Sequence, residues 1–280
     1  MKNLEENNYP GVQVDRFEES EVVGYPIANM NYAQTVDQIE RWADRREKRY
    51  VCVCNVHSLT SSRWMPELKD ALESSDMNIA DGVPLVWMQR AVGYRSASRV
   101  YGPNLMLELM NRCNQKGLRV ALYGGHTNRI YKLVSGLKAD FKDLKVVKVI
   151  SPPFRPLTKQ EDDDFTKQLQ DARPDVILVG IGCPKQEIWM KDHSPKIRGV
   201  MIGVGAAFDF HAGAVKQAPA RIQSMGLEWA YRLYREPKRL FKRYISTNPV
   251  FIVLAAKQLM AKVLVRKKYV HSRMFFAGSN

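Results

Sequence analysis

A carboxylate that could do acid–base chemistry follows a short apolar segment. Asp81 comes directly after Met77–Ala80, which is expected to be a strand, and it precedes Gly82. A carboxylate at a strand end could serve as a general base that removes the proton of an attacking hydroxyl group. An Asp in this place could equally cap the helix that is expected to begin near Pro84. The spacing alone leaves both interpretations open.

Glycines follow two other apolar segments, where a diphosphate could approach the backbone closely. They are the pair Gly124–Gly125 and the Gly-Ile-Gly segment that ends at Gly182. Shortly after the second segment in the sequence, Lys185 could neutralise a phosphate and Gln186 could bind a sugar. Tight turns between strands and helices also need glycine, and both side chains would also suit a plain surface. No Gly-x-Gly-x-x-Gly and no Walker motif occurs, which argues against a dinucleotide or a P-loop.

Motifs for metal binding and for nucleophilic catalysis are weak. Asp162–Asp164 contains Asp-x-Asp, a pattern that can hold a divalent metal with a nucleotide diphosphate. However, Thr158 and Glu161 predict a capping box, which places these acidic side chains at a helix N-terminus instead. His57, His126, His193 and His211 lack ligand spacing, and no Gly-x-Ser-x-Gly elbow is present. The sequence therefore predicts no metal and no cofactor.

Alternating strands and helices are expected to position these side chains. The expected strands are Tyr50–Cys54, Met77–Ala80, Leu118–Tyr123, Lys145–Ile150, Asp175–Gly180 and Gly199–Val204. The stretches of helical period between them include Thr35–Arg46, Leu105–Gln115, Thr127–Lys138 and Thr158–Ala172. This alternation predicts an α/β fold with a mostly parallel, Rossmann-like sheet and helices on both faces. Ligands of such sheets gather beyond the carboxyl ends of the strands, where Asn55, Asp81 and Asp209 are expected.

The excess positive charge lies in the C-terminal part of the chain. The 280 residues include 43 Lys and Arg against 29 Asp and Glu, a net charge of +14. Residues 216–280 hold 14 of the basic and 2 of the acidic residues, so they carry +12, and the rest of the chain carries +2. We therefore expect a flexible N-terminal segment at 1–20, an α/β catalytic domain at 21–215 and a basic, membrane-binding appendage at 216–280.

Apolar and basic side chains recur in this appendage at helical spacing, with an interruption at Pro237. The apolar ones are Leu227, Ala230, Leu233, Tyr234, Leu240, Phe241 and Tyr244, and the basic ones are Arg232, Arg235, Arg239, Lys242 and Arg243. A basic amphipathic helix with aromatic anchors suits an anionic lipid surface. The alternatives are the solvated face of a packed helix and an RNA-binding surface. The neighbouring apolar run Val250–Ala256 fits lipid better than RNA.

The sequence predicts a cytoplasmic protein that is attached peripherally to the inner face of the membrane. The first 20 residues are polar and acidic, without the apolar core of a signal peptide. The apolar run Val250–Ala256 is far shorter than the roughly 20 residues that cross a bilayer. The four cysteines are too few and too scattered for a disulfide framework.

Taken in order along the chain, seven motifs resemble those of the WecG/TagA/CpsF glycosyltransferases, bacterial enzymes of cell-surface polysaccharide synthesis. The resemblance runs from about residue 50 to about residue 250. The motifs are Ala80–Gly82, Arg99–Pro103, Tyr123–Gly125, the Pro-rich loop Ser151–Leu157, Val179–Glu187, Gly203–Phe210, and Gly226–Arg232 with Glu236–Arg239. Singly each is weak, but together and in this order they are specific.

The resemblance implies an inverting, metal-independent transfer of a sugar from a UDP donor to a polyprenyl-diphosphate-linked sugar. It implies Asp81 as the general base, and Asn55 and Gln186 as active-site contacts. It also implies that the appendage supplies cations to the donor diphosphate. These cations are Arg232 and Arg239, with Lys242 or Arg243. The other substrate-binding residues expected at strand ends and in the motifs are Arg99, Gly124, Gly125, Gly182, Lys185 and Asp209.

Two positions depart from the family pattern, and two other functions stay open. Val53 stands where the family often has Thr, and Asn104 stands where an Asp is usual. An NAD- or S-adenosylmethionine-dependent Rossmann-like enzyme would leave the basic appendage unexplained. A basic RNA-binding protein would give no role to the glycine-rich strand ends. We expect no nucleic-acid partner. The donor sugar, the first sugar of the acceptor and homo-oligomerisation are left open.

Overall fold

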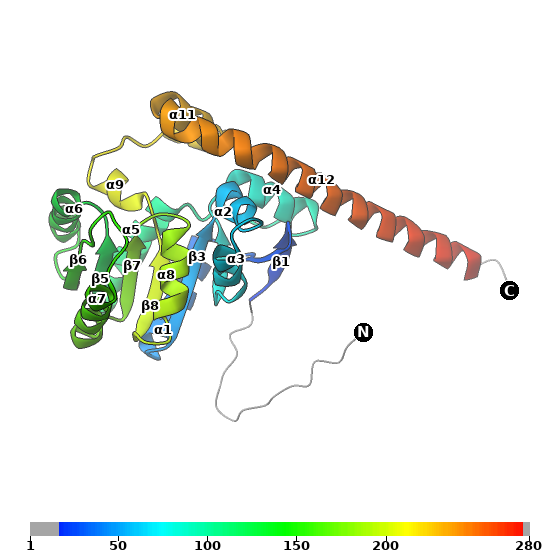
Figure 1. Ribbon diagram of the computed structural model, residues 1–280. Coiled ribbons are helices and arrows are strands. Elements are labelled where there is room, and N and C mark those ends of the chain that lie inside the picture. The colour runs from blue at the N-terminus through cyan, green and yellow to red at the C-terminus, as the bar shows by residue number, and fades with distance from the viewer. Residues whose placement is uncertain (1–16, 277–280) are drawn as a thin grey trace.

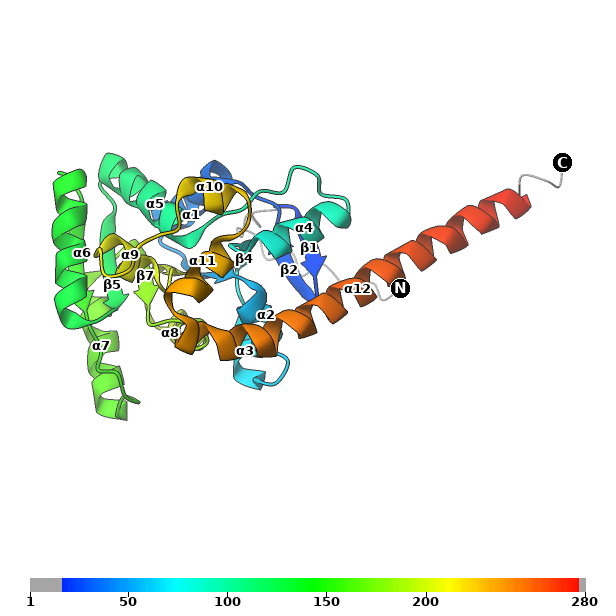
Figure 2. The ribbon, with the colours of Figure 1, turned by 90° about the horizontal axis from the view of Figure 1, so that it is seen from above.

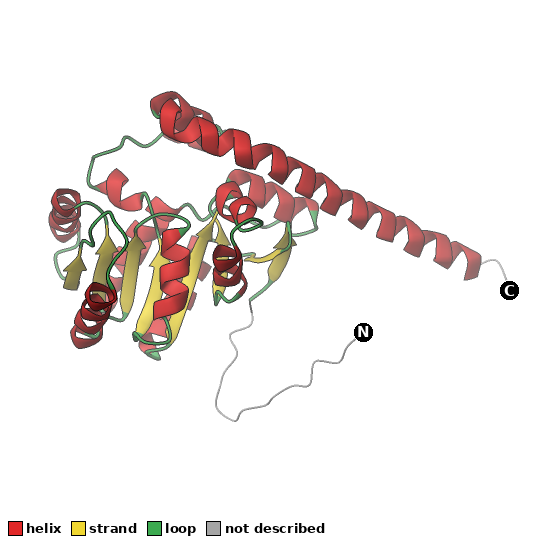
Figure 3. Ribbon diagram, in the orientation of Figure 1, coloured by secondary structure: helices red, strands yellow, loops and turns green. Residues whose placement is uncertain are grey.

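An eight-stranded sheet lies between two layers of helices, and a long helix extends from its edge (Figure 1 and Figure 3). The computed structural model describes residues 17–276. The strands are β1 (Glu19–Val22), β2 (Tyr25–Ala28), β3 (Lys48–Cys54), β4 (Met77–Ala80), β5 (Arg119–Gly124), β6 (Lys145–Ile150), β7 (Val176–Gly180) and β8 (Gly199–Gly203). Their order in the sheet is β1-β2-β4-β3-β8-β7-β5-β6, and every pair except β1–β2 is parallel. The α/β fold class is confirmed.

Helices cover both faces of the sheet because alternate strand residues are apolar on both sides. The helices are α1 (Tyr32–Asp44), α2 (Val56–Ser61), α3 (Pro66–Glu73), α4 (Val83–Ala91), α5 (Gly102–Lys116), α6 (Thr127–Asp140), α7 (Lys159–Ala172), α8 (Lys185–His193), α9 (Ala207–His211), α10 (Ala220–Ser224), α11 (Glu228–Arg235) and α12 (Pro237–Phe276). On β3, Val51 and Val53 pack with α1 and α5, whereas Cys52 and Cys54 pack with α2, α3 and α8. Such two-sided burial is what a parallel sheet requires.

The sequence analysis missed the antiparallel hairpin β1–β2, which extends the sheet beyond β4. Its strands have four residues each, too few for a clear alternation. The boundary expected at residue 20 falls inside β1, and residues 1–16 of the expected N-terminal segment lie outside the described residues. The other six strands are confirmed within two residues at each end.

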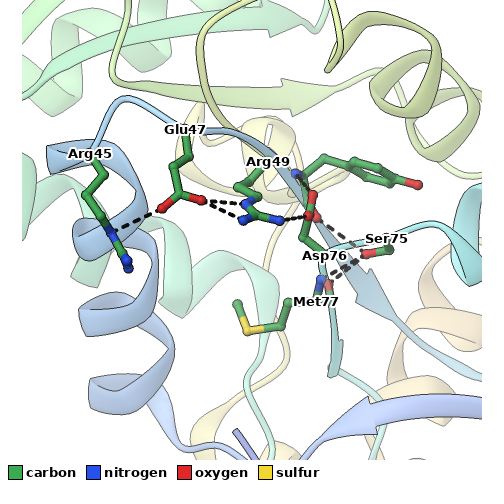
Figure 4. Close-up of polar contacts among 7 residues, drawn as sticks. Arg45, Glu47, Arg49, Ser75, Asp76 and Met77 are labelled. Carbon is green, nitrogen blue, oxygen red and sulfur yellow. Dashed lines mark hydrogen bonds and ion pairs between the residues drawn. The ribbon is translucent and has the colours of Figure 1, made fainter. Parts of the chain in front are cut away.

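A chain of charges at the amino ends of β3 and β4 fixes how these two strands pair (Figure 4). Glu47 contacts Arg45 at 3.1 Å and Arg49 at 2.7 Å. Arg49 reaches Asp76 at 2.6 Å, and the second oxygen of Asp76 accepts a hydrogen bond of 2.9 Å from the backbone N–H of Tyr50. The register that results pairs Cys54 with Ala80 at the other end of the strands. The residues that follow, Asn55 and Asp81, therefore emerge side by side.

The C-terminal part consists of α10, α11 and α12, and it lies over the carboxyl ends of the strands. Seen from above, α12 crosses α2 and then runs past the body of the protein (Figure 2). The break expected at Pro237 is confirmed, since α11 ends at Arg235 and α12 begins at Pro237. Leu240 and Phe251 of α12 are buried. Over residues 17–276, we find no helix with the length and apolar character of a membrane span.

Gly124 is required by the packing of β5 on β7. Its φ is +127°, and a Cβ at this residue would lie 2.5 Å from the carbonyl carbon of Gly180. A Cβ on Gly180 would in turn lie 2.5 Å from the Phe208 ring. The glycines at these strand ends therefore allow two strands and α9 to meet.

We predict that Gly124→Ala destabilises the protein by about 2–5 kcal/mol, because it combines a strained backbone with a backbone clash. Urea unfolding measures this change. The matched control is Gly136→Ala, since Gly136 is exposed inside α6 and a Cβ there would meet nothing within 4 Å. Removing a helical glycine should stabilise by about 0.5–1 kcal/mol. Equal stabilities of the two variants would contradict this account of Gly124.

Candidate active site

A cavity of about 510 Å³ opens between the carboxyl ends of β3 and β4 and the helices α11 and α12. Its charged and polar lining includes Asn55, His57, Asp81, Arg99, Glu228, Arg232 and Arg243. The first four come from the sheet domain and the last three from the C-terminal helices. The predicted catalytic Asp81 thus lies in one cavity with residues that are far away in sequence.

Asp81 is held at the end of β4 by backbone hydrogen bonds. Its N–H donates to the carbonyl of Cys54 at 2.8 Å, and its Oδ1 accepts from the N–H of Gly102 at 3.3 Å. The N-cap residue of α4 is Gly82, without a side-chain cap, so the alternative that Asp81 caps this helix is wrong. The carboxylate instead meets the first residue of α5 and faces the cavity.

Burial raises the pKa of Asp81, and the nearby carboxylate of Glu228 adds to this effect. The guanidinium of Arg99, 3.6 Å from Oδ1, and the Gly102 N–H act in the opposite direction without cancelling it. The side chain keeps 19% of its surface exposed, enough for contact with a ligand in the cavity. A carboxylate with raised proton affinity that still faces a cavity suits a general base.

Arg99 joins the sheet domain to the C-terminal helices. Its Nη2 lies 2.7 Å from Oε2 of Glu228, the first residue of α11, and its Nε donates to the carbonyl of Asp81. Its guanidinium lies 4.2 Å from the centre of the Tyr101 ring. The sequence analysis missed Glu228. The available signal was that residues 216–280 contain only two acidic residues, of which Glu228 is one.

Asn55 and His57, which directly follow β3, also belong to the polar lining of the cavity. The side chain of Asn55 caps α2, where its Oδ1 accepts from the N–H groups of His57 and Ser58 at 3.0 and 3.2 Å. The same oxygen lies 3.5 Å from Nη2 of Arg243. Burial and the charge of Arg243 lower the pKa of His57 to about 4, so the ring is neutral near pH 7. The sequence analysis had no signal for His57, because it lacks a partner at a recognisable spacing.

Of the predicted cations of the appendage, Arg232 and Arg243 line the cavity. The guanidinium of Arg232 lies 5.4 Å from the centre of the Phe210 ring, and its buried Nε has no partner among the described residues. Lys242 is exposed and does not line the cavity, so the geometry favours Arg243 where the sequence left both open. The side chain of Arg239 lies outside the described residues.

Gln186 and Lys185 lie at the end of β7, outside the lining of this cavity. Gln186 is buried, and its Nε2 donates to the carbonyl of Gly203 at 3.2 Å and to Glu187 at 2.9 Å. Its Oε1 has no partner among the described side chains and lies close to Gly205. Lys185 is exposed at the start of α8, after the open turn at Gly182. Their roles as substrate contacts stay predictions.

The remaining predicted residues are also outside the cavity. Gly124 lies against the backbone of Gly180 and Gly125 lies against Phe208, while Asp209 of α9 forms an ion pair of 2.9 Å with Arg129. They gather at the carboxyl ends of β5 and β7, further along the same edge of the sheet. Substrate binding by them therefore stays a prediction as well.

The acidic run Asp162–Asp164 belongs to a helix start. Thr158 Oγ1 accepts from the N–H of Glu161 and the Glu161 carboxylate accepts from the N–H of Thr158, which confirms the capping box. Asp162 lies 3.1 Å from His193 Nε2. Among the side chains that the structure describes, no three of His, Cys, Asp or Glu gather in a way that could hold a metal ion.

The sequence also matches known proteins over this whole arrangement. The profile of the glycosyl transferase WecG/TagA/CpsF family matches residues 20–264, which include both the sheet domain and the cavity-lining part of α12. The chain belongs to this family. Family membership favours a transferase over the NAD- or S-adenosylmethionine-dependent and RNA-binding alternatives.

Two curated members of the family are similar to most of the chain. An N-acetylglucosaminyldiphosphoundecaprenol N-acetyl-beta-D-mannosaminyltransferase of Bacillus subtilis (strain 168) is 29% identical over 79% of this chain and 85% of its own length. A protein of the same name from Bacillus spizizenii is 25% identical over 79% of this chain and 84% of its own length. The similarity therefore covers most of the length of both relatives.

Proposed function

We propose that the protein is a hexosyltransferase that moves a sugar from a UDP-sugar donor to a polyprenyl-diphosphate-linked sugar. The observation that carries this proposal is the cavity itself. It brings a partly buried carboxylate with a raised pKa, Asp81, into one cavity with the cations Arg232 and Arg243. Transfer from a nucleotide diphosphate needs both a base for the acceptor hydroxyl and positive charge for the leaving group.

In the proposed reaction, the carboxylate of Asp81 takes the proton of an acceptor hydroxyl group. The hydroxyl oxygen attacks the anomeric carbon of the donor sugar, and the bond from that carbon to the diphosphate oxygen breaks. The bonding electron pair leaves with UDP. One displacement by one base inverts the anomeric centre. Glu228, the other carboxylate of the cavity, is paired with Arg99 at 2.7 Å, which leaves Asp81 as the better base.

The cations of the C-terminal helices neutralise the charge that develops on the departing UDP. Arg232 lines the cavity, and its buried Nε–H group, which has no partner among the described residues, can donate a hydrogen bond to the diphosphate. Arg243 lines the cavity from α12. Fixed guanidinium groups in a partly buried site stabilise such charge without a metal ion. We therefore propose a metal-independent reaction.

The two relatives suggest which substrates to test first. Their names state N-acetylmannosaminyl transfer to N-acetylglucosaminyldiphosphoundecaprenol. We propose the same donor and acceptor classes for this chain, in the synthesis of a cell-envelope polysaccharide.

We predict that the new glycosidic bond has the opposite anomeric configuration to the donor, because one displacement inverts the anomeric centre. NMR of the product measures this configuration, and retention of the donor configuration would contradict the inverting mechanism.

We predict that Asp81→Asn lowers transfer about 10²- to 10⁴-fold and leaves UDP binding intact, because only proton removal is lost. The matched control is Asp164→Asn on the exposed face of α7, which should transfer like the wild type. Because Asp81 must be ionised to act, kcat/KM should fall on the acidic side as the carboxylate is protonated. Since burial raises its pKa, this fall should lie above the ordinary aspartate pKa of about 3.9. Full turnover by Asp81→Asn would refute the assignment.

We predict that Arg243→Ala weakens UDP binding about tenfold or more, whereas Lys242→Ala changes it far less. The reason is that Arg243 lines the cavity and Lys242 is exposed next to it on the same helix. A lost charge-assisted hydrogen bond costs about 1.5–3 kcal/mol, and 1.4 kcal/mol is a factor of ten. Isothermal titration with UDP measures both variants. The opposite order of the two effects would show that Lys242 is the functional cation.

We also propose that the C-terminal helices attach the protein to the inner, cytoplasmic face of the membrane. Exposed Tyr234 and Phe241 accompany the basic side chains of α11 and α12. We predict that the full chain floats with anionic vesicles, and that the double variant Tyr234→Ser/Phe241→Ser lowers the bound fraction about tenfold. Tyr131→Ser removes an equally exposed aromatic ring from α6 and is the control. Unchanged flotation of the double variant would contradict this surface.

A further inference from the structure

The cavity that contains Asp81 continues away from the charged residues as an apolar groove between α4 and α12. The side chains that line this α4–α12 groove are Trp87, Met88, Ala91, Ile252, Ala255 and Leu259. On α12 they recur at a spacing of three or four residues, and on α4 the adjacent Trp87 and Met88 lie four and three residues before Ala91, so they form one stripe per helix. The groove and the polar site are parts of the same cavity.

Polar contacts beyond the groove hold its two walls in place. The ammonium group of Lys262 on α12 donates to the carbonyl of Val92, directly after α4. Gln258 of α12 accepts from the N–H of Val23 at 2.8 Å and donates to the carbonyl of Glu21 at 2.7 Å, so it bonds to the hairpin β1–β2. These contacts hold α12 against the sheet domain beyond the groove.

Folding leaves much apolar surface uncovered along this groove. Trp87 is 60% exposed and Ile252 is 65% exposed, although both line the cavity. A contiguous apolar surface next to a polar site is characteristic of a place where an apolar ligand binds. The ligand that fits the whole cavity therefore has an anionic, polar end and an apolar chain.

We propose that the α4–α12 groove binds the first isoprene units of the acceptor's polyprenyl chain. This inference rests on the proposed function and adds to it a site for the lipid part of the substrate. The chain would lie along Ile252, Ala255 and Leu259, while the sugar that it carries reaches Asp81. A membrane acyl chain or a second copy of the protein would explain the apolar stripes but not their continuity with the cavity around Asp81.

Ala255→Trp tests the groove, because the larger ring occupies its space. The matched control is Ala261→Trp, since Ala261 is exposed on the same helix and does not line the cavity. The probes are geranylgeranyl diphosphate and methyl diphosphate, which share a head group and differ in the chain. We expect Ala255→Trp to bind geranylgeranyl diphosphate about tenfold more weakly than the wild type does. We expect Ala261→Trp to bind it normally, and all three proteins to bind UDP equally.

Three results would overturn the proposal. The first is equal binding of geranylgeranyl diphosphate by Ala255→Trp and the wild type. The second is equal affinity of the wild type for the two diphosphates, since the chain would then contribute nothing. The third is a dimer in light scattering that Ala255→Trp dissociates, since a second copy would then cover the groove. Transfer by the wild type is measured separately, so prenyl binding without any transfer would contradict the proposed function and support the groove.

Discussion

The candidate site depends on one guanidinium group that lies between two carboxylates. Arg99 is 2.7 Å from Glu228 and 3.6 Å from Asp81. Burial raises the pKa of Asp81 and the charge of Glu228 adds to this effect, while the guanidinium of Arg99 lowers it without cancelling it. The pair of Arg99 and Glu228 binds the start of α11 to the sheet domain. The pair that positions the C-terminal helices therefore also places two charges beside the proposed base, and both act on its proton affinity.

The sequence was sufficient to predict the sheet and the place of Asp81 in it. Apolar runs and helical periods defined the six central strands, and the parallel order put their ends on one edge. The charges that set the register of β3 and β4, Glu47, Arg49 and Asp76, were not recognised. The strands β1 and β2 were not predicted, because strands of four residues offer too little alternation to detect.

The side of the cavity that the C-terminal helices form was harder to predict. Helical spacing finds a basic face, but the rotation of α12 about its axis decides that Arg243, and not its neighbour Lys242, points inward. That rotation follows from tertiary contacts such as those of buried Leu240 and Phe251. The glycines were ambiguous for a different reason. A glycine can allow either a ligand or a neighbouring strand to approach the backbone closely. Gly124 makes a close contact with Gly180, which the sequence alone does not reveal.

The hydrogen bonds between Gln258 and the first hairpin join residues about 235 positions apart in the chain. Contacts of such sequence separation form late, because a long loop must close before they contribute. During synthesis, every strand of the sheet is made before Gln258 and Lys262. The contacts that hold α12 beside α4 are then still missing, and the cavity receives its second wall only after this part of α12 has been made. The order of synthesis thus keeps the nascent chain without a finished site until α12 has been made.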